Sequence, residues 1–256
     1  MSSTMTAAAP IVYPDSDGMP MADNTQQFRA IVTIQGNLEA LFRDRADVFV
    51  AGDLLWYPVE GRPDIRRAPD AMVVFGRPKG DRGSYRQWEE EGIAPQVVFE
   101  VLSPGNTLTE MAAKFEFYDR YGVEEYYLYD PASGDLSGWR REGGRLRVIE
   151  EIDGWVSPRL GVRFRREGGE VRMYLPDGRP FLSFVELQDQ LARAAARRGG
   201  RTRGSGRQRA EAEQQRAEAE RQRAEAEQQR AEAERQRAER LAARLRALGI
   251  DPDEDV

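Results

Sequence analysis

The sequence QVVFEVLSPGNTLTEMAAKFEFYDRYGVEEYYLYD, residues 96–130, contains the clearest structural signal in the chain. The nearly continuous apolar run at Gln96–Ser103 is typical of a strand in the middle of a sheet. Pro-Gly-Asn-Thr then predicts a turn, and Thr107 can cap a helix that runs to about Tyr121, where a glycine ends it. Glu125–Tyr129 is a second apolar run. The stretch therefore predicts a strand, a helix and a strand in succession.

Further elements are expected on both sides of this stretch. Upstream, apolar residues at helical spacing predict an amphipathic helix over Thr25–Phe42, and the runs Val48–Tyr57 and Ala71–Gly76 predict strands. Downstream, short apolar stretches joined by Gly-rich turns predict a β-rich extension, and a further helix is expected over residues 182–198. This order indicates an α/β fold with a mixed central sheet flanked by helices, followed by a long C-terminal helix.

Changes of composition divide the chain into five segments. We expect an extended N-terminal segment at 1–22, the α/β domain at 23–198, a Gly-rich flexible linker at 199–208, a charged heptad-repeat helix at 209–249 and an acidic tail at 250–256.

The heptad repeat alternates RAEAEQQ with RAEAERQ, and its residue types and Arg–Glu spacings favour a helix. Its alanines lie two and five residues apart, whereas a coiled-coil seam needs three and four. Only Leu241, Leu245 and Leu248 form a proper apolar seam. Two interpretations stay open: a solvated single helix, or a helix that self-associates, as in a homodimer, or binds a protein partner.

Composition excludes several kinds of chemistry. The 256 residues include no Cys and no His, which rules out disulfides, thiolate or imidazole metal sites, cysteine nucleophiles and the Ser-His-Asp triad. No apolar run is long enough for a membrane span and no signal peptide is evident, so we expect a cytoplasmic protein without a membrane partner. The net charge of −6 does not favour binding DNA by bulk electrostatics.

Two carboxylates lie in or beside apolar strands. Asp70 precedes the strand AMVVF, and Glu100 lies inside VVFEV. A carboxylate in a central strand is costly unless a charged or hydrogen-bonding group meets it. An ion pair with an arginine, or a strand end that reaches solvent, would explain Glu100 without any catalytic role. Two carboxylates on neighbouring strands, together with a lysine, are also the groups needed to hold Mg²⁺ and hydrolyse a phosphodiester.

Lys114 is the candidate lysine, in the helix that follows Glu100. Of the 38 basic residues only Lys79 and Lys114 are lysines, so a compact ammonium could be needed at position 114. The alternative is a surface ion pair between Glu110 and Lys114, worth about 0.3–0.5 kcal/mol.

Three stretches, APDAMVVF, QVVFEVLSPGNT and KFEFYDRYGVEEYYLYDP, resemble the Uma-type restriction endonuclease family of the PD-(D/E)XK nuclease superfamily. The resemblance covers roughly residues 13–187. It implies a restriction-endonuclease-like core whose metal site lies at one end of the sheet, with Pro69 and Asp70 as the PD pair and Glu100 as the second acid. Leu102 occupies the usual lysine position, so the lysine is displaced onto the following helix as Lys114. Relatives often carry a His near the start of the first long helix, where this chain has Asn24–Gln27.

The resemblance and the residues together predict a DNA endonuclease. Asp70, Glu100 and the Val101 carbonyl would bind Mg²⁺ or Mn²⁺, and Lys114 would orient or deprotonate the attacking water. Gln96 and Ser103 are candidate hydrogen-bond partners of these groups. Asp53 is a candidate additional ligand, although an exposed face of an edge strand explains it equally well. The alternative function is a catalytically inactive, nuclease-derived scaffold that binds nucleic acid or protein.

Overall fold

The computed structural model describes residues 11–247 and divides the chain into two units, Met1–Leu187 and Gln188–Val256, which are treated separately here. The helices are α1 (Thr25–Leu41), α2 (Leu108–Arg120) and α3 (Phe184–Ala247), with a short 3-10 helix η1 (Gln87–Glu90). The strands are β1 (Val48–Ala51), β2 (Trp56–Tyr57), β3 (Ala71–Phe75), β4 (Tyr85–Arg86), β5 (Val97–Val101), β6 (Glu125–Asp130), β7 (Asp135–Glu142), β8 (Arg145–Val148), β9 (Arg163–Glu167) and β10 (Glu170–Tyr174).

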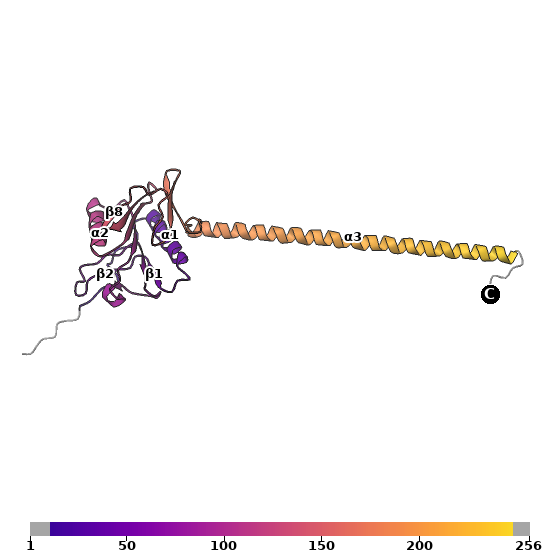
Figure 1. The fold of residues 1–256 in the computed structure, drawn as a ribbon, viewed down its shortest axis with the longest axis horizontal. Helices are drawn as coiled ribbons and strands as arrows, with labels where there is room; N and C mark the ends of the chain where they lie inside the picture. The colour runs from indigo at the N-terminus through magenta and orange to yellow at the C-terminus, as the bar shows by residue number, and fades with distance from the viewer. Residues whose placement is uncertain (1–10, 248–256) are drawn as a thin grey trace, which may run out of the picture. The chain divides into compact units, whose positions relative to one another are not determined.

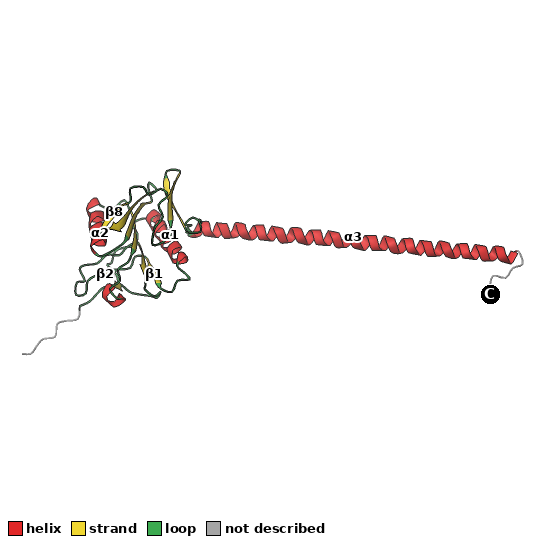
Figure 2. Ribbon diagram, in the orientation of Figure 1, coloured by secondary structure: helices red, strands yellow, loops and turns green. Residues whose placement is uncertain are grey.

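Six strands form a mixed central sheet in the order β1-β3-β5-β6-β7-β8 (Figures 1 and 2). All neighbours in this sheet are antiparallel except β5 and β6, which are parallel. Parallel neighbours require a crossover connection, and α2 provides it. The pairs β9–β10 and β2–β4 form two small separate sheets. The expected mixed α/β fold with flanking helices is confirmed.

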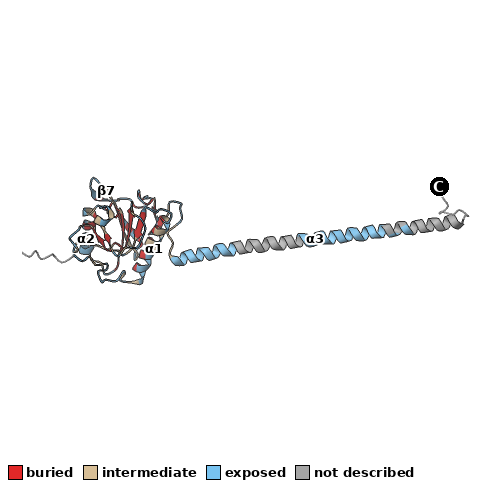
Figure 3. Cartoon of the chain, turned by 90° about the horizontal axis from the view of Figure 1, so that it is seen from below, coloured by how far each residue is buried: buried red, intermediate tan, exposed pale blue. Residues whose placement is uncertain are grey.

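Side chains of the central sheet alternate between two apolar cores, because successive strand residues point to opposite faces. Val97 and Phe99 belong to the core that contains α1. Val98, between them, belongs to the core that contains Phe117 and Tyr118 of α2. The buried residues of both cores gather on and around the sheet (Figure 3). This alternation directs the side chain of residue 100 to the α2 face.

Helix capping follows the sequence pattern. The Asn24 side chain accepts hydrogen bonds from the N–H groups of Gln26 and Gln27 at the start of α1. Thr107 accepts from the N–H of Glu110 at the start of α2, as its position predicts. Gly122 follows the end of α2 with a φ of 94°, a conformation that glycine adopts without a Cβ penalty.

The strand predicted over Val48–Tyr57 is interrupted in the structure. β1 ends at Ala51, the chain turns at Gly52 and Asp53, and β2 leaves the central sheet to pair with β4. A Cβ on Gly52 would lie 3.1 Å from the Asp70 carbonyl oxygen, so this close approach favours glycine. Asp53 itself has a φ of 51°, which fits a turn rather than a strand. The interruption places Asp53 next to the start of β3.

In the C-terminal unit, helix α3 differs from expectation in one respect. It continues through residues 199–208, where we predicted a flexible linker. Each glycine costs about 1 kcal/mol relative to alanine, but the segment contains no proline and strong helix formers flank it, so cooperative extension can offset this cost. The boundary between units falls between Leu187 and Gln188 instead of after residue 198.

Side chains along the described parts of α3, residues 188–197 and 212–230, are exposed (Figure 3). The Leu241, Leu245 and Leu248 side chains lie outside the described residues, so self-association stays a prediction. Residues 1–10 and 250–256 also lie outside them. Over residues 11–247, no helix has both the length and the apolar character needed to cross a bilayer.

Candidate active site

Asp70 and Glu100 lie side by side at one end of the central sheet. Ala71 pairs with Phe99 across β3 and β5, so the next position of the ladder sets Asp70 against Glu100 on the α2 face. The N–H of Val101 donates to Asp70 Oδ2 over 2.6 Å. Both side chains are buried, Glu100 with 1% and Asp70 with 9% of its surface exposed. The structure therefore brings the two predicted acids together.

Helix α2 supplies two groups that hold Glu100. The ammonium of Lys114 donates to Glu100 Oε2 over 2.8 Å, and the hydroxyl of Tyr118 donates to Oε1. Residues four apart lie on the same helix face, which is why Lys114 and Tyr118 reach the same carboxylate. Lys114 therefore forms an ion pair with the buried Glu100. The alternative considered from the sequence was a surface ion pair with Glu110.

The two acids are buried next to each other, and both their burial and their proximity affect the pKa of Asp70. Burial, and after it the neighbouring Glu100 carboxylate, together raise the pKa of Asp70 to about 8. For Lys114, burial lowers the pKa, but the Glu100 and Asp70 carboxylates outweigh this effect, so the pKa is raised and the ammonium stays charged. One ammonium thus faces two carboxyl groups. A bound cation would favour ionisation of both acids.

The Val101 carbonyl, the third predicted metal-binding group, is contacted from α1. Gln27 Nε2 donates to this oxygen over 2.9 Å, and Gln27 Oε1 accepts from the N–H of Asp23 over 2.8 Å. The hydroxyl of Ser103 donates to Asp23 Oδ2. Ser103 and Gln27 therefore fasten the segment before α1 to the loop after β5. A carbonyl oxygen has two lone pairs, so Val101 retains one beside the Gln27 bond.

Of the two remaining predicted site residues, Asp53 lies near the acids and Gln96 does not. The N–H of Asp53 donates to the Pro69 carbonyl over 2.9 Å, and the pKa of Asp53 is raised by burial, then by Asp17, against the lowering effect of Lys114. Asp53 therefore belongs to the same electrostatic environment as the two acids. Gln96 lies at the opposite end of β5, where its amide bonds the backbone of Phe75. The structure does not bring Gln96 to the other site residues.

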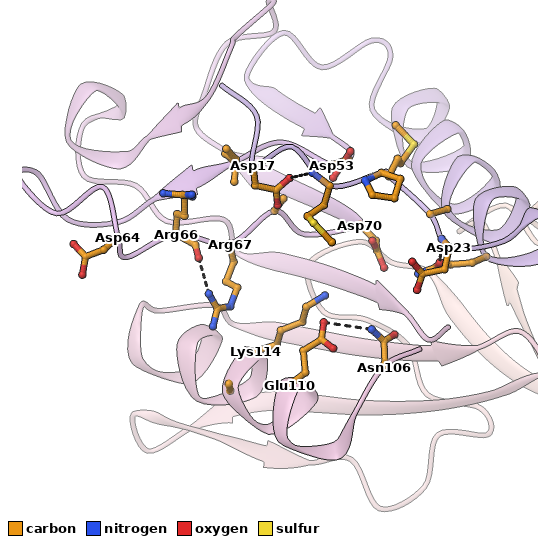
Figure 4. A pocket seen from close by; sticks show the side chains of 18 residues that line it. Asp17, Asp23, Asp53, Asp64, Arg66, Arg67, Asp70, Asn106, Glu110 and Lys114 are labelled. Carbon is orange, nitrogen blue, oxygen red and sulfur yellow. Dashed lines mark hydrogen bonds between the residues drawn. The ribbon is translucent and has the colours of Figure 1, made fainter. Parts of the chain in front are cut away.

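A cleft of about 710 Å³ opens onto Asp70 and Lys114 (Figure 4). One wall is the segment before α1, which is anchored farther back by the ring of Tyr13 against Tyr57 and Trp88. Another wall is the loop between β2 and β3. The charged residues that line the cleft are Asp17, Asp23, Asp53, Asp64, Asp70, Glu110, Arg66, Arg67 and Lys114.

The donor set is suited to a hard divalent cation. Two adjacent carboxylates and a carbonyl are oxygen ligands of the kind that Mg²⁺ and Mn²⁺ prefer, and Mg²⁺ normally keeps several waters. Within the described residues no cluster of three or more Asp, Glu, His or Cys side chains could hold a metal by itself. A cation here would therefore rest on Asp70, Glu100, the Val101 oxygen and water.

Comparison with known proteins identifies the family. The sequence model described as "Uma2: Putative restriction endonuclease" matches residues 18–178, more than half of the chain. The chain belongs to the Uma2 family. The match includes all of the residues that form the acid cluster.

A solved structure is also similar to this Uma2 chain: the "crystal structure of a putative nuclease belonging to DUF820" from Anabaena variabilis ATCC 29413. The identity is 16% and the TM-score 0.40, over 54% of this chain and 73% of the other. No curated protein sequence matches the chain.

Sequence reasoning missed two residues of the Uma2 site. Tyr118 lies in the quoted stretch KFEFYDRYGVEEYYLYDP, and its four-residue spacing from Lys114 could have indicated a shared helix face. Gln27 lies in the segment where relatives often carry a His, but nothing local indicates that its amide reaches a residue 74 positions away. The first role could be found from spacing, whereas the second required the tertiary structure.

Proposed function

We propose that the chain is a metal-dependent DNA endonuclease that hydrolyses phosphodiester bonds with Mg²⁺ or Mn²⁺. The observation that best supports this function is the buried Glu100, which interacts with a second carboxyl group, Asp70, and with the ammonium of Lys114, both of which line an open cleft. A purely structural buried carboxylate needs only donors around it. A second buried acid beside it raises the free energy of folding and is typical of catalytic sites.

In this proposal Asp70, Glu100 and the Val101 carbonyl hold the cation. When bound, the cation supplies Lewis-acid stabilisation of negative charge on the phosphate and lowers the pKa of water. Asp70 is kept in place by the Val101 N–H, and the Val101 carbonyl is kept in place by Gln27. The Ser103–Asp23 hydrogen bond tethers the loop that follows β5. Asp53 is a candidate outer ligand that could bind through water.

Lys114 has the second chemical role. Its ammonium retains donors beyond the one directed at Glu100, so it can orient the attacking water and offset charge on the pentacoordinate phosphate; because it stays protonated, it does not take the proton of that water. The Tyr118 hydroxyl, on α2, donates a hydrogen bond to the other Glu100 oxygen, which leaves the carboxylate little freedom to rotate. These two contacts position Glu100 before a substrate arrives.

The test is cleavage of supercoiled plasmid and of single-stranded DNA by the full chain with Mg²⁺, Mn²⁺ or EDTA. We expect nicking or linearisation with either metal, none with EDTA, and none by Asp70→Asn. Metal binding by calorimetry provides a second readout, since Asp70→Asn should weaken it. If neither DNA is cleaved under any metal condition and the parent still binds nucleic acid, the nuclease-derived scaffold is the better description.

A further inference from the structure

Two adjacent arginines line the cleft without a carboxylate partner. Arg66 and Arg67 belong to the loop that leads into β3, and both are half-buried. Within the described part of the chain, neither takes part in an ion pair. The nearest acid in sequence, Asp64, is instead paired bidentately with Arg62. Both guanidinium charges are therefore uncompensated by a direct contact.

The two guanidinium groups are held in place by neutral groups. Arg66 Nη1 donates to the Pro63 carbonyl over 2.7 Å, and Arg67 Nη1 donates to the Arg66 carbonyl over 2.9 Å. The Arg67 guanidinium lies 5.5 Å from the centre of the Phe117 ring on α2. Its backbone forms a two-bond bridge with the buried Trp56, at 2.8 and 3.2 Å. Most of the five donors on each guanidinium stay available.

The arginines lie close to the acids along the chain. Arg67 lies three positions before Asp70, which limits the distance between their Cα atoms to about 10 Å. Figure 4 shows Arg66 and Arg67 to the left of Lys114, with Asp64 beyond Arg66, Glu110 beside Lys114, and Asp70 and Asp23 to the right of Lys114. The other charged groups that line the cleft are carboxylates. Phosphate groups would therefore be attracted to one part of the cleft and repelled by the rest.

We propose that Arg66 and Arg67 bind the DNA backbone phosphate that flanks the cleaved bond, and so fix the strand across Asp70 and Glu100. This proposal rests on the proposed nuclease function and names the part of the site that holds the substrate. A guanidinium is planar and can donate two parallel hydrogen bonds to phosphate oxygens. The placement of Arg67 by Trp56 and Phe117 reduces the entropy lost when phosphate binds. Both are positioning residues.

The experiment measures binding apart from cleavage. Fluorescence anisotropy of a labelled DNA oligonucleotide, single- or double-stranded, gives the Kd of the full chain between 50 and 300 mM salt, in EDTA and in Ca²⁺. We expect Arg66→Gln and Arg67→Gln each to raise Kd about tenfold and to reduce the salt slope by roughly 0.7–0.9. The Lys variants should keep most of the slope but bind more weakly, because they lose the bidentate geometry.

Arg147 provides the matched control, since it is exposed on β8 and makes no ion pair within the described residues. Arg147→Gln should leave Kd and slope unchanged. In cleavage assays the Arg66 and Arg67 variants should raise KM more than they lower kcat. Melting temperatures monitor folding, and Arg67→Lys replaces Arg67→Gln if the latter is unstable.

The outcomes separate the two proposals. Unchanged Kd and slope in the Arg66→Gln/Arg67→Gln double variant overturn the phosphate site and leave the nuclease function intact. Arginine-dependent binding by a parent that never cleaves supports the phosphate site and overturns the nuclease function. A parent chain that binds neither DNA at 50 mM salt overturns the phosphate site outright.

Discussion

Two glutamates on neighbouring strands are equally buried, each with 1% of its surface exposed, yet their surroundings differ. Glu125 on β6 accepts from Tyr127 Oη, Ser157 Oγ and the N–H of Arg159. Glu100 on β5 instead meets an ammonium, one hydroxyl and the Asp70 carboxyl group. Alternation along the parallel pair directs these two side chains to opposite faces of the sheet.

This difference distinguishes a carboxylate held by neutral donors from one that shares its site with a second acid and an ammonium. The oxygens of Glu125 are occupied by donors from its own strand and from a loop, and no pocket described here includes it. Those donors restrain the effect of burial, which still raises the pKa of Glu125. The Glu100 cluster holds a second acid whose charge is not fully compensated, and Asp70 and Lys114 line a cleft. Burial alone is therefore a poor guide to function, whereas the identity of the partners is informative.

The largest expected effect comes from neutralising each glutamate in turn. Glu100→Gln should reduce DNA cleavage by roughly 10³-fold, because it removes a proposed metal ligand and the partner of Lys114. Glu125→Gln should leave cleavage within a few fold and instead lower the free energy of unfolding by about 1–3 kcal/mol, since an amide cannot accept from every donor there. Plasmid cleavage and denaturant unfolding measure the two effects. Equal loss of cleavage in both variants would erase the contrast.

Glu100 has an ammonium partner, Lys114, and Glu125 has none among its hydrogen-bond partners described above. Substitution of Lys114 tests what this partner contributes. Lys114→Arg should lower cleavage by at least ~10²-fold with little change in melting temperature, because the larger planar guanidinium keeps the charge but cannot place its donors as the compact ammonium does. Lys79→Arg is the matched control, since Lys79 pairs with Glu39 on the surface and is the other lysine of the chain. Initial rates of cleavage decide the matter. A fully active Lys114→Arg protein would remove Lys114 from the mechanism.

The two tyrosines give a finer comparison, since each donates a hydrogen bond to one of the buried glutamates. Tyr118→Phe should lower kcat about tenfold by freeing one oxygen of Glu100, with a modest loss of stability. Tyr127→Phe should reduce stability by a similar amount and leave kcat unchanged. Parallel measurements of kcat and melting temperature test this. Loss of stability without loss of kcat in Tyr118→Phe would show that the tyrosine only supports packing.

The remaining effect does not involve cleavage and is a pH dependence of stability in the metal-free protein. The pKa of Asp70 is raised to about 8 in the folded state, against roughly 3.9 when unfolded, so the native state retains a proton that the unfolded chain has lost. Its stabilising contribution is complete below the unfolded value and is lost as pH rises through about 8, by at most about 1.4 kcal/mol per pH unit.

Asp70→Asn should remove this part of the pH slope, and Mg²⁺ should stabilise the parent at pH 8 more than the variant. Urea unfolding between pH 5 and 9, with EDTA or Mg²⁺, measures both. Glu125→Gln serves as the control, because its own raised pKa contributes a slope that Mg²⁺ should not alter. Parallel pH curves for the parent and Asp70→Asn would contradict the assignment of the proton to Asp70.

The sequence predicted elements whose signals are local. Thr107 marks the start of α2, and the apolar run around Glu100 marks a central strand, because capping and hydrophobic patterning act over a few residues. The turn at Gly52 and Asp53 was missed because the apolar run VFVAGDLLWY conceals a change of pairing partner. Gln96 was predicted to be a hydrogen-bond partner of the site groups, but it lies at the other end of β5, a full strand length from them. Only the tertiary structure shows which strand a residue pairs with and at which end of the sheet it lies.

The parallel pairing of β5 and β6 also bears on how the site is assembled during folding. The contacts from Lys114 and Tyr118 to Glu100 span 14 and 18 residues, whereas those of Asp70 and Gln27 with Val101 span 31 and 74. Loop-closure entropy grows with separation, so the strand–helix–strand unit can bring Glu100, Lys114 and Tyr118 together before the outer strands and α1 dock. We therefore expect the contacts among Glu100, Lys114 and Tyr118 to form early and the site to be completed only by the longest-range contact, that of Gln27 with Val101.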